Sequence, residues 1–130
     1  MTTMNALEKF TREYDFTISP RILYAAISTP EGLSRWFADL VLLDGDVFSF
    51  KWEGSEQKAR LVHSKDNEFV RFLWLDDFHQ GHHLEMQIVS EPMYRSVALV
   101  VTDYAEASEL DLSQRIWDAQ IKKLQRLFNA

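Results

Sequence analysis

Three histidines gather in one short segment that also carries two carboxylates. His79, His82 and His83 follow Asp76 and Asp77, and imidazole and carboxylate groups are the usual protein ligands of zinc and nickel. His82 and His83 are adjacent at the start of an expected strand, so their side chains point to opposite faces and only one could share an ion with His79. We therefore interpret the segment as a solvated loop and predict no metal site.

Other side chains capable of acid–base chemistry lie on expected strands. His63, Arg12 and Arg71 interrupt segments that are otherwise rich in apolar residues. A cyclase-type active site would need such groups to converge in a pocket, where burial shifts their pKa values. We favour the alternative that they lie on the outer sheet face or at strand ends, with packed stems and solvated heads. The sequence has no nucleophile elbow, glycine-rich phosphate loop or paired-carboxylate motif, so we predict no catalytic residues and no cofactor.

Aromatic residues are unusually frequent, with nine Phe, four Tyr and four Trp. A set of bulky residues is expected to face the space between a sheet and a helix, where hydroxyl and indole N–H groups would orient a small apolar or aromatic ligand. The same rings could instead fill the core, and their bulk favours a filled core or a narrow cleft over a wide lipid cavity. The predicted ligand-binding residues are Tyr14, Phe16, Trp36, Phe37, Phe48, Phe50, Trp52, Phe72, Trp74, Met86, Trp117 and Ile121.

Length and charge limit the classes of protein that remain. The 130 residues fit a single domain spanning 1–130. Twenty acidic residues against 14 basic ones give a net charge of −6, which disfavours loose binding to nucleic acid or anionic lipid. The chain has no cysteine, and no apolar stretch approaches the roughly 20 residues needed to cross a membrane. Its start lacks the basic and apolar regions of a secretory signal, so we expect a cytoplasmic protein.

The elements that position these residues follow from sequence periodicity. Alternation from Phe10 to Ile18 predicts a strand. Ser19-Pro20 and Thr29-Pro30 each predict the start of a short helix, and the second helix includes Trp36 and Phe37 in its apolar stripe. A long helix with Ser108 as its N-cap ends the chain. Between the helices, turn signals about every ten residues predict six strands, at 40–43, 47–52, 58–63, 69–75, 82–89 and 96–104.

These elements predict an α+β fold of order β-α-α-β6-α. An antiparallel sheet of this length must cover its apolar face, and the C-terminal helix carries the only stripe long enough to do so. We expect a curved antiparallel sheet wrapped around the long C-terminal helix, with the two short helices closing one end. In Phe69–Leu75 both faces are bulky, so the pattern leaves open which face points inward. An outward apolar stripe there would suit a partner protein or a homodimer, unless the N-terminal segment or the short helices cover it.

Three segments resemble a known family. These are STPEGLSRWFA (Ser28–Ala38), GDVFSFKWEGSE (Gly45–Glu56) and FVRFLWLDD (Phe69–Asp77). Together they resemble the START-like or SRPBCC (Bet v 1-like) superfamily, and within it the Aha-type branch, relatives of a heat-shock ATPase activator. With VALVVTDYAE and the closing helix around Trp117, the whole chain is most similar to compact START-like proteins of Bacteroidetes. The resemblance implies the helix-grip fold.

The resemblance implies several functions, because the superfamily includes lipid carriers, hormone receptors, polyketide cyclases, ring-hydroxylase subunits and co-chaperone domains. We predict a non-catalytic START-like domain that binds a small hydrophobic ligand in the cleft between the sheet and the C-terminal helix. One alternative is a co-chaperone-like protein-interaction module, whose partner or second copy would bind the outer sheet face. The other is a polyketide-cyclase-type enzyme.

Overall fold

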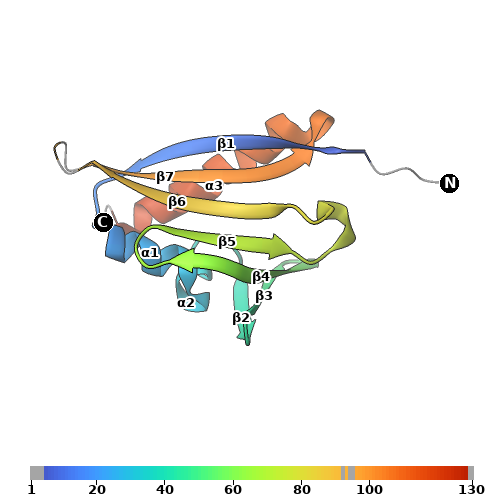
Figure 1. Ribbon diagram of the computed structural model, residues 1–130, viewed down its shortest axis with the longest axis horizontal. Coiled ribbons are helices and arrows are strands. Elements are labelled where there is room, and N and C mark those ends of the chain that lie inside the picture. The colour runs from blue at the N-terminus through green and yellow to red at the C-terminus, as the bar shows by residue number, and fades with distance from the viewer. Residues whose placement is uncertain (1–4, 92, 94–95, 129–130) are drawn as a thin grey trace.

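The computed structural model describes residues 5–91, 93 and 96–128, and Figure 1 shows their arrangement. Seven strands form one antiparallel sheet of order β1-β7-β6-β5-β4-β3-β2. The long helix α3 packs on one face of this sheet, and the short helices α1 and α2 lie near the C-terminal end of α3. This arrangement confirms the predicted α+β helix-grip architecture and its element order.

The first strand, β1, spans Leu7–Phe16, and its length is set by its neighbour in the sheet. It pairs with β7 from Leu7, opposite Glu106, to Phe16, opposite Val97. The predicted strand began three residues later, at Phe10. Alternation within this segment holds no information about β7, and it is the pairing with β7 that extends the strand to Leu7.

The two short helices begin where their caps predict. In α1 (Pro20–Ser28) the Ser19 hydroxyl accepts a hydrogen bond from the Ile22 N–H at 3.3 Å. In α2 (Pro30–Leu33) the Thr29 hydroxyl accepts one from the Gly32 N–H at 3.0 Å. Glycine is required at position 32, because a Cβ there would overlap the carbonyl oxygen of Ala25 in α1.

The second helix is shorter than predicted. It ends at Leu33, so Trp36 and Phe37 lie in the turn that follows and not on a helical stripe. Both side chains are nevertheless buried, at 3% and 4% exposure. The Trp36 indole N–H donates to the carbonyl oxygen of Ala26 at 2.9 Å, which holds this turn against α1.

The remaining strands form a meander of hairpins. They are β2 (Leu40–Asp44), β3 (Val47–Trp52), β4 (Ser55–Lys65), β5 (Phe69–Trp74), β6 (His83–Glu91) and β7 (Ser96–Glu106). The register between β4 and β5 shifts between Leu61 and His63, which marks a β-bulge. The sequence predicts a turn at residues 90–94, between the last two strands. Residues 90 and 91 instead belong to β6, and residues 92 and 94 lie outside the described part of the chain.

The last helix is preceded by one 3₁₀ turn. Ala107–Glu109 form η3, and Leu110–Phe128 form α3. Ser108 lies inside η3, so the prediction that it caps the helix was wrong, and no side chain caps η3 at Glu106. Helical spacing predicts one apolar stripe made of Leu110, Trp117, Ile121, Leu124 and Phe128. In the structure Trp117, Ile121 and Leu124 are buried, and Leu110 and Phe128 pack at the ends of the stripe. Within the described residues, no helix is both long and apolar enough to cross a membrane.

The core lies between α3 and the concave face of the sheet. In β5 the residues Val70, Phe72 and Trp74 face inward, at 0–4% exposure, so Phe69 and Leu73 lie on the outer face. This settles the orientation that alternation alone left open.

The outer sheet face combines apolar and charged side chains. Arg71 of β5 pairs with Glu85 of β6 at 3.1 Å, between the outward Phe69 and Leu73. Leu75, which follows β5, is 40% exposed. His63 contacts the Phe69 ring and is exposed, so His63 and Arg71 lie on the outer face, as predicted.

Candidate functional site

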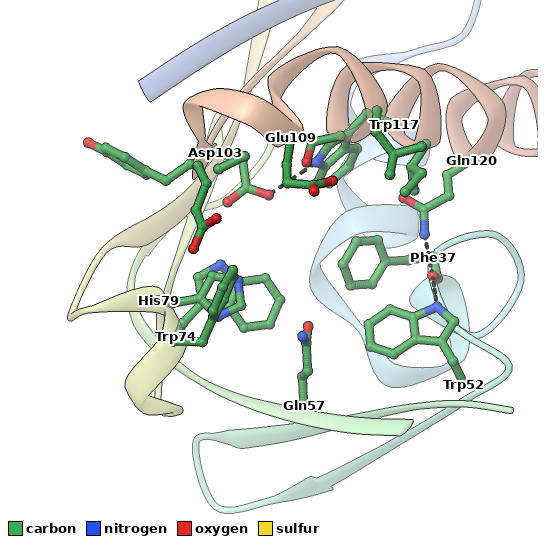
Figure 2. Close-up of a pocket in the computed structure, with 16 residues that line it drawn as sticks. Phe37, Trp52, Gln57, Trp74, His79, Asp103, Glu109, Trp117 and Gln120 are labelled. Atoms are coloured by element: carbon green, nitrogen blue, oxygen red, sulfur yellow. Dashed lines mark hydrogen bonds between the residues drawn. The ribbon is translucent and has the colours of Figure 1, made fainter. Parts of the chain in front are cut away.

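A cavity of about 600 Å³ lies beneath the first half of α3. The end of β7, the end of β5 with the 3₁₀ turn η1 (Asp77–His79), and the turn after α2 form its other walls. Figure 2 shows aromatic side chains on two sides of it and polar groups on the others. The rings that line it are those of Phe37, Trp52, Trp74, Phe78, Tyr104 and Trp117.

One backbone carbonyl ties three elements together at the cavity wall. The carbonyl oxygen of Phe37 accepts a hydrogen bond from the Trp52 indole N–H at 2.9 Å and another from the Gln120 amide at 2.8 Å. Both bonds are visible in Figure 2. The Phe37 ring also packs against Trp52 and Trp117, with ring centroids 5.6 and 5.5 Å apart. The turn after α2 is therefore fixed to both β3 and α3, and the aromatic wall has a defined shape.

A buried carboxyl group lies at the opposite side of the cavity. Asp103 occupies an inward position on β7 and is 9% exposed. Its Oδ2 accepts a hydrogen bond from the Trp117 indole N–H at 3.1 Å, while its Oδ1 has no partner among the described residues. Burial raises the pKa of Asp103, and hydrogen bonds from the Tyr104 backbone N–H and from Trp117 offset only part of this effect.

A second buried polar atom without a partner lies near this carboxyl. The indole of Trp74 is 4% exposed and its N–H donates to no acceptor in the described structure. It lies near enough to Asp103 to contribute to lowering the pKa of that carboxyl, but the two groups do not meet the geometry of a hydrogen bond. The cavity wall thus offers one free acceptor and one free donor, both of which are costly to bury unsatisfied.

His79 is part of this wall, and the expectation of a solvated loop was wrong for it. Its side chain is buried at 7% exposure and stacks on Trp74, with ring centroids 4.6 Å apart. Its Nδ1 lies 2.7 and 2.8 Å from the two carboxylate oxygens of Asp76, which also caps η1. His82 stacks instead on Tyr104. In the described part of the chain, no three His, Asp or Glu side chains are grouped to hold a metal ion.

The structure divides the predicted ligand-binding residues into two groups. Phe37, Trp52, Trp74 and Trp117 line the cavity. Tyr14 is half-buried beside α3, and the others are buried in the core: Phe16, Trp36, Phe48, Phe50, Phe72, Met86 and Ile121. The role of all twelve in binding remains a prediction.

Sequence reasoning missed the polar residues of the cavity. Asp103, Glu109, Gln57 and Gln120 line it, and none was singled out. The sequence did contain one indication of Asp103. It follows Val97, Leu99 and Val101 at the alternating positions of β7 whose side chains are buried. A carboxyl group at such a core-facing position indicates a buried polar site, because an acidic side chain is rarely buried without a specific reason.

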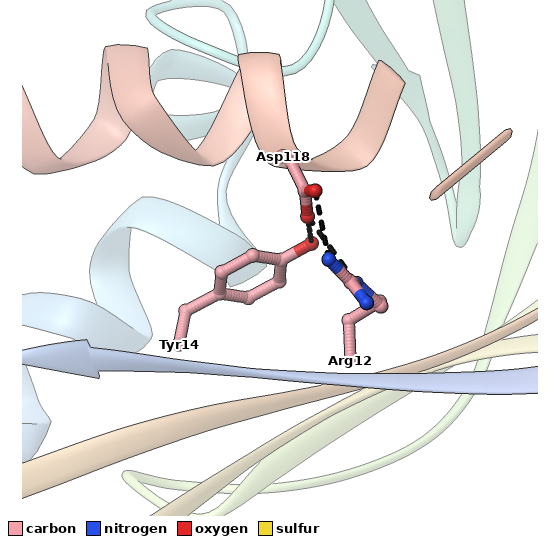
Figure 3. Close-up of polar contacts among 3 residues, drawn as sticks. All are labelled: Arg12, Tyr14 and Asp118. Carbon is pink, nitrogen blue, oxygen red and sulfur yellow. Dashed lines mark hydrogen bonds and ion pairs between the residues drawn. The ribbon is translucent and has the colours of Figure 1, made fainter. Parts of the chain in front are cut away.

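A polar network connects β1 to the middle of α3, outside the cavity lining (Figure 3). The Arg12 guanidinium donates to both carboxylate oxygens of Asp118, at 2.8 and 3.3 Å, and the Tyr14 hydroxyl donates to Asp118 at 2.7 Å. Arg12 therefore lies on the inner side of the sheet, toward α3, and the expectation of a solvated outer position or strand end was wrong for it. The apolar face of β1 admits this arginine because α3 supplies its counter-charge.

We expect the network to contribute stability that disappears in acid. Partial desolvation raises the pKa of Asp118, but hydrogen bonds from Tyr14 and Arg12 outweigh it and hold that pKa below its ordinary value. A carboxyl whose pKa is lower in the folded state stabilises the protein above its unfolded pKa of about 4. That contribution is lost as the pH falls through the folded pKa.

Asp118→Asn should therefore lower the thermal midpoint modestly at pH 7 and have a progressively smaller effect as the pH falls below about 4. Thermal unfolding followed by circular dichroism over this pH range measures the effect. The matched control is Asp111→Asn, since Asp111 is exposed and pairs only with Arg115 one turn along α3, so solvent screens the pair. Equal effects of the two variants at pH 7 would contradict the assignment.

Comparison with known proteins agrees with this architecture. The family model of the START-like superfamily domain matches residues 4–130, and the chain therefore belongs to the START-like superfamily. The solution structure of BfR322 from Bacteroides fragilis is 36% identical and has a TM-score of 0.65, with 93% of this chain and 90% of that one covered. A separate comparison with curated proteins found no match to this chain.

More distant solved structures share the fold. The solution structure of the Aha1 dimer from Colwellia psychrerythraea has a TM-score of 0.79 at 15% identity, covering 91% of this chain and 93% of that one. CalU16 from Micromonospora echinospora has a TM-score of 0.72 at 13% identity, covering 98% and 84% of the two chains. At these identities the similarity establishes the fold alone.

Proposed function

We propose that residues 1–130 act as one START-like domain that binds a small, largely aromatic or apolar molecule and performs no chemistry on it. The observation that supports this most directly is the cavity under α3, where aromatic walls surround a free buried acceptor on Asp103 and a free buried donor on Trp74. Ligand sites combine an apolar lining with a few polar groups that orient the ligand. A volume of about 600 Å³ suits one small molecule and is too small for a two-chain lipid.

The binding experiment uses 2-naphthylmethanol as a neutral aromatic probe, titrated calorimetrically into the purified protein. We expect saturable binding at one site. Ser113→Phe should abolish it, because Ser113 lines the cavity from α3 and a phenyl ring there would occupy the ligand's space.

The matched control is Ala119→Phe, which adds the same ring at an exposed position of α3 that does not border the cavity. It should bind the probe like the parent protein. Unchanged affinity in Ser113→Phe would overturn the proposed function, as would failure of the parent protein to bind this alcohol and its cationic and anionic naphthalene analogues.

A cyclase-type enzyme is the second candidate, and one observation favours it. The carboxyl group of Asp103 and the imidazole of His79 border the same cavity, so two groups capable of proton transfer converge there. The Nδ1 of His79 is engaged by Asp76, which leaves Nε2 as the ring nitrogen that would transfer a proton. Recovery of a chemically altered probe after prolonged incubation would favour the enzyme over the carrier.

The co-chaperone-like alternative would use the outer sheet face. That face presents Phe69, Leu73 and Leu75, but the Arg71–Glu85 ion pair interrupts the apolar surface. A partner or second copy bound there should be displaced by Leu73→Asp without loss of folding. The cavity, with its unsatisfied buried atoms, carries the stronger case.

A further inference from the structure

We propose that the ligand of this cavity is a cation, an aromatic or apolar molecule that carries a protonated amine held by Asp103. The inference rests on the proposed function and specifies its ligand class. It is drawn from the charges that line the cavity, from the unsatisfied buried oxygen and from the aromatic residues around it.

The charged side chains of the cavity lining are almost all acidic. Asp103, Glu106 and Glu109 contribute carboxyl groups, and no Lys or Arg is among the lining residues in the described ranges. In Figure 2 the side chains of Asp103 and Glu109 both point into the cavity from the end of β7 and from η3. The one basic ring among the lining residues, that of His79, lies against the Asp76 carboxylate. An anionic ligand would meet repulsion here, whereas a cation would be attracted.

The Oδ1 atom of Asp103 provides a specific contact for such a cation. The carboxyl is buried and this oxygen has no hydrogen-bond partner in the described structure. An ammonium group would donate to it and would also compensate the charge, forming a charge-assisted hydrogen bond. Burial raises the pKa of Asp103 in the empty protein, and a bound cation would reverse that effect by stabilising the ionised carboxylate.

The remaining lining also suits an amine on an aromatic body. Trp74 and Trp117 flank the Asp103 carboxyl through their N–H edges, and their rings enclose it in aromatic surroundings that exclude water from an ion pair formed there. On the opposite side, Phe37 and Trp52 form the apolar wall that would receive the aromatic body. The Trp74 N–H remains available to an oxygen atom of the ligand or to a bridging water.

The test compares three probes that share a naphthalene ring and differ in charge at pH 7. They are 2-naphthylmethylamine (cationic), 2-naphthylmethanol (neutral) and 2-naphthoate (anionic), each titrated calorimetrically into the full chain. We expect the amine to bind at least about tenfold more tightly than the alcohol, as expected for a buried charge pair, and the carboxylate to bind most weakly.

The variant Asp103→Asn links this preference to one side chain. It should bind the amine no better than the alcohol. The control Asp111→Asn removes the same charge from an exposed position of α3 outside the cavity lining, and it should keep the full amine preference. Near-ultraviolet circular dichroism establishes that each variant retains its tertiary structure.

Each other outcome counts against a specific claim. If the alcohol or the carboxylate binds as well as the amine, the cation inference is wrong while the binding function stands. If Asp103→Asn keeps the amine preference, Asp103 is not the partner of the amine and the inference is again overturned. If none of the three probes binds, the proposed binding function fails and the inference fails with it.

Discussion

Replacing Phe50 with alanine is expected to lower the free energy of unfolding by about 3–5 kcal/mol. Phe50 is 0% exposed, and its ring centroid lies 4.9 Å from that of Phe37 and 6.0 Å from those of Phe72 and Trp74. Truncation would remove these contacts and leave a void that neighbouring strands cannot close. Urea denaturation followed by tryptophan fluorescence measures the loss.

The matched control is Phe78→Ala, the same truncation at a ring that lines the cavity and is 49% exposed. It should cost less than about 1 kcal/mol, because a half-exposed ring buries little additional surface, but it should weaken binding of 2-naphthylmethanol. Comparing Phe50→Ala with Phe78→Ala therefore distinguishes an aromatic residue of the core from one that borders the cavity. Equal destabilisation by the two substitutions would contradict this division.

Replacing Asp103 with asparagine is expected to stabilise the protein at pH 7 in the absence of ligand, by about 1–2 kcal/mol, because a buried carboxylate charge costs more free energy than a neutral amide in the same place. Asparagine keeps the shape of the side chain and can still accept the Trp117 hydrogen bond. It removes the buried charge, which the empty cavity does not compensate.

The pH dependence of this effect has a defined sign. Because burial raises the pKa of Asp103 in the folded protein, the unfolded chain loses its proton first, near pH 4. Stability therefore falls as the pH rises from about 4 through the folded pKa.

The difference in free energy of unfolding between Asp103→Asn and the parent protein should therefore be small at pH 4 and grow toward pH 7. Urea titrations at a series of pH values measure it. Of the other ionisable groups bordering this cavity, Glu106, Glu109 and His79, the charge of His79 acts on Asp103 and lowers its pKa, so this interaction forms part of the measured difference. A constant difference across the range would mean that Asp103 is not a buried acid.

A binding site that destabilises its own empty protein is consistent with a carrier. The unpaired oxygen of Asp103 and the unpaired N–H of Trp74 cost stability until a ligand satisfies them. The same two residues therefore connect the stability prediction to the binding prediction. Asp103→Asn should gain stability and lose the preference for a cationic ligand together, and this combination distinguishes a functional carboxyl from a structural one.

The sequence by itself determined the order of the elements and the family. Ser19 and Thr29 cap helices as predicted, because an N-cap depends on residues three positions apart. Alternation located β3 with its observed bounds, and the stripe of Trp117, Ile121 and Leu124 identified the helix that covers the sheet. All of these signals involve residues that lie close together in the sequence, so they can be recognised from the sequence alone.

The tertiary structure alone decided where space remains between the side chains. Alternation showed that Phe72 and Trp74 share a face, but only packing against α3 turned that face inward. Phe50 and Trp52 belong to the same face of β3, yet Phe50 is buried and Trp52 borders the cavity. His79 was expected in solvent because its neighbours are polar, and it is buried because Trp74 provides a surface on which it stacks. Cavity volume depends on distances between residues far apart in the chain, which no local pattern encodes.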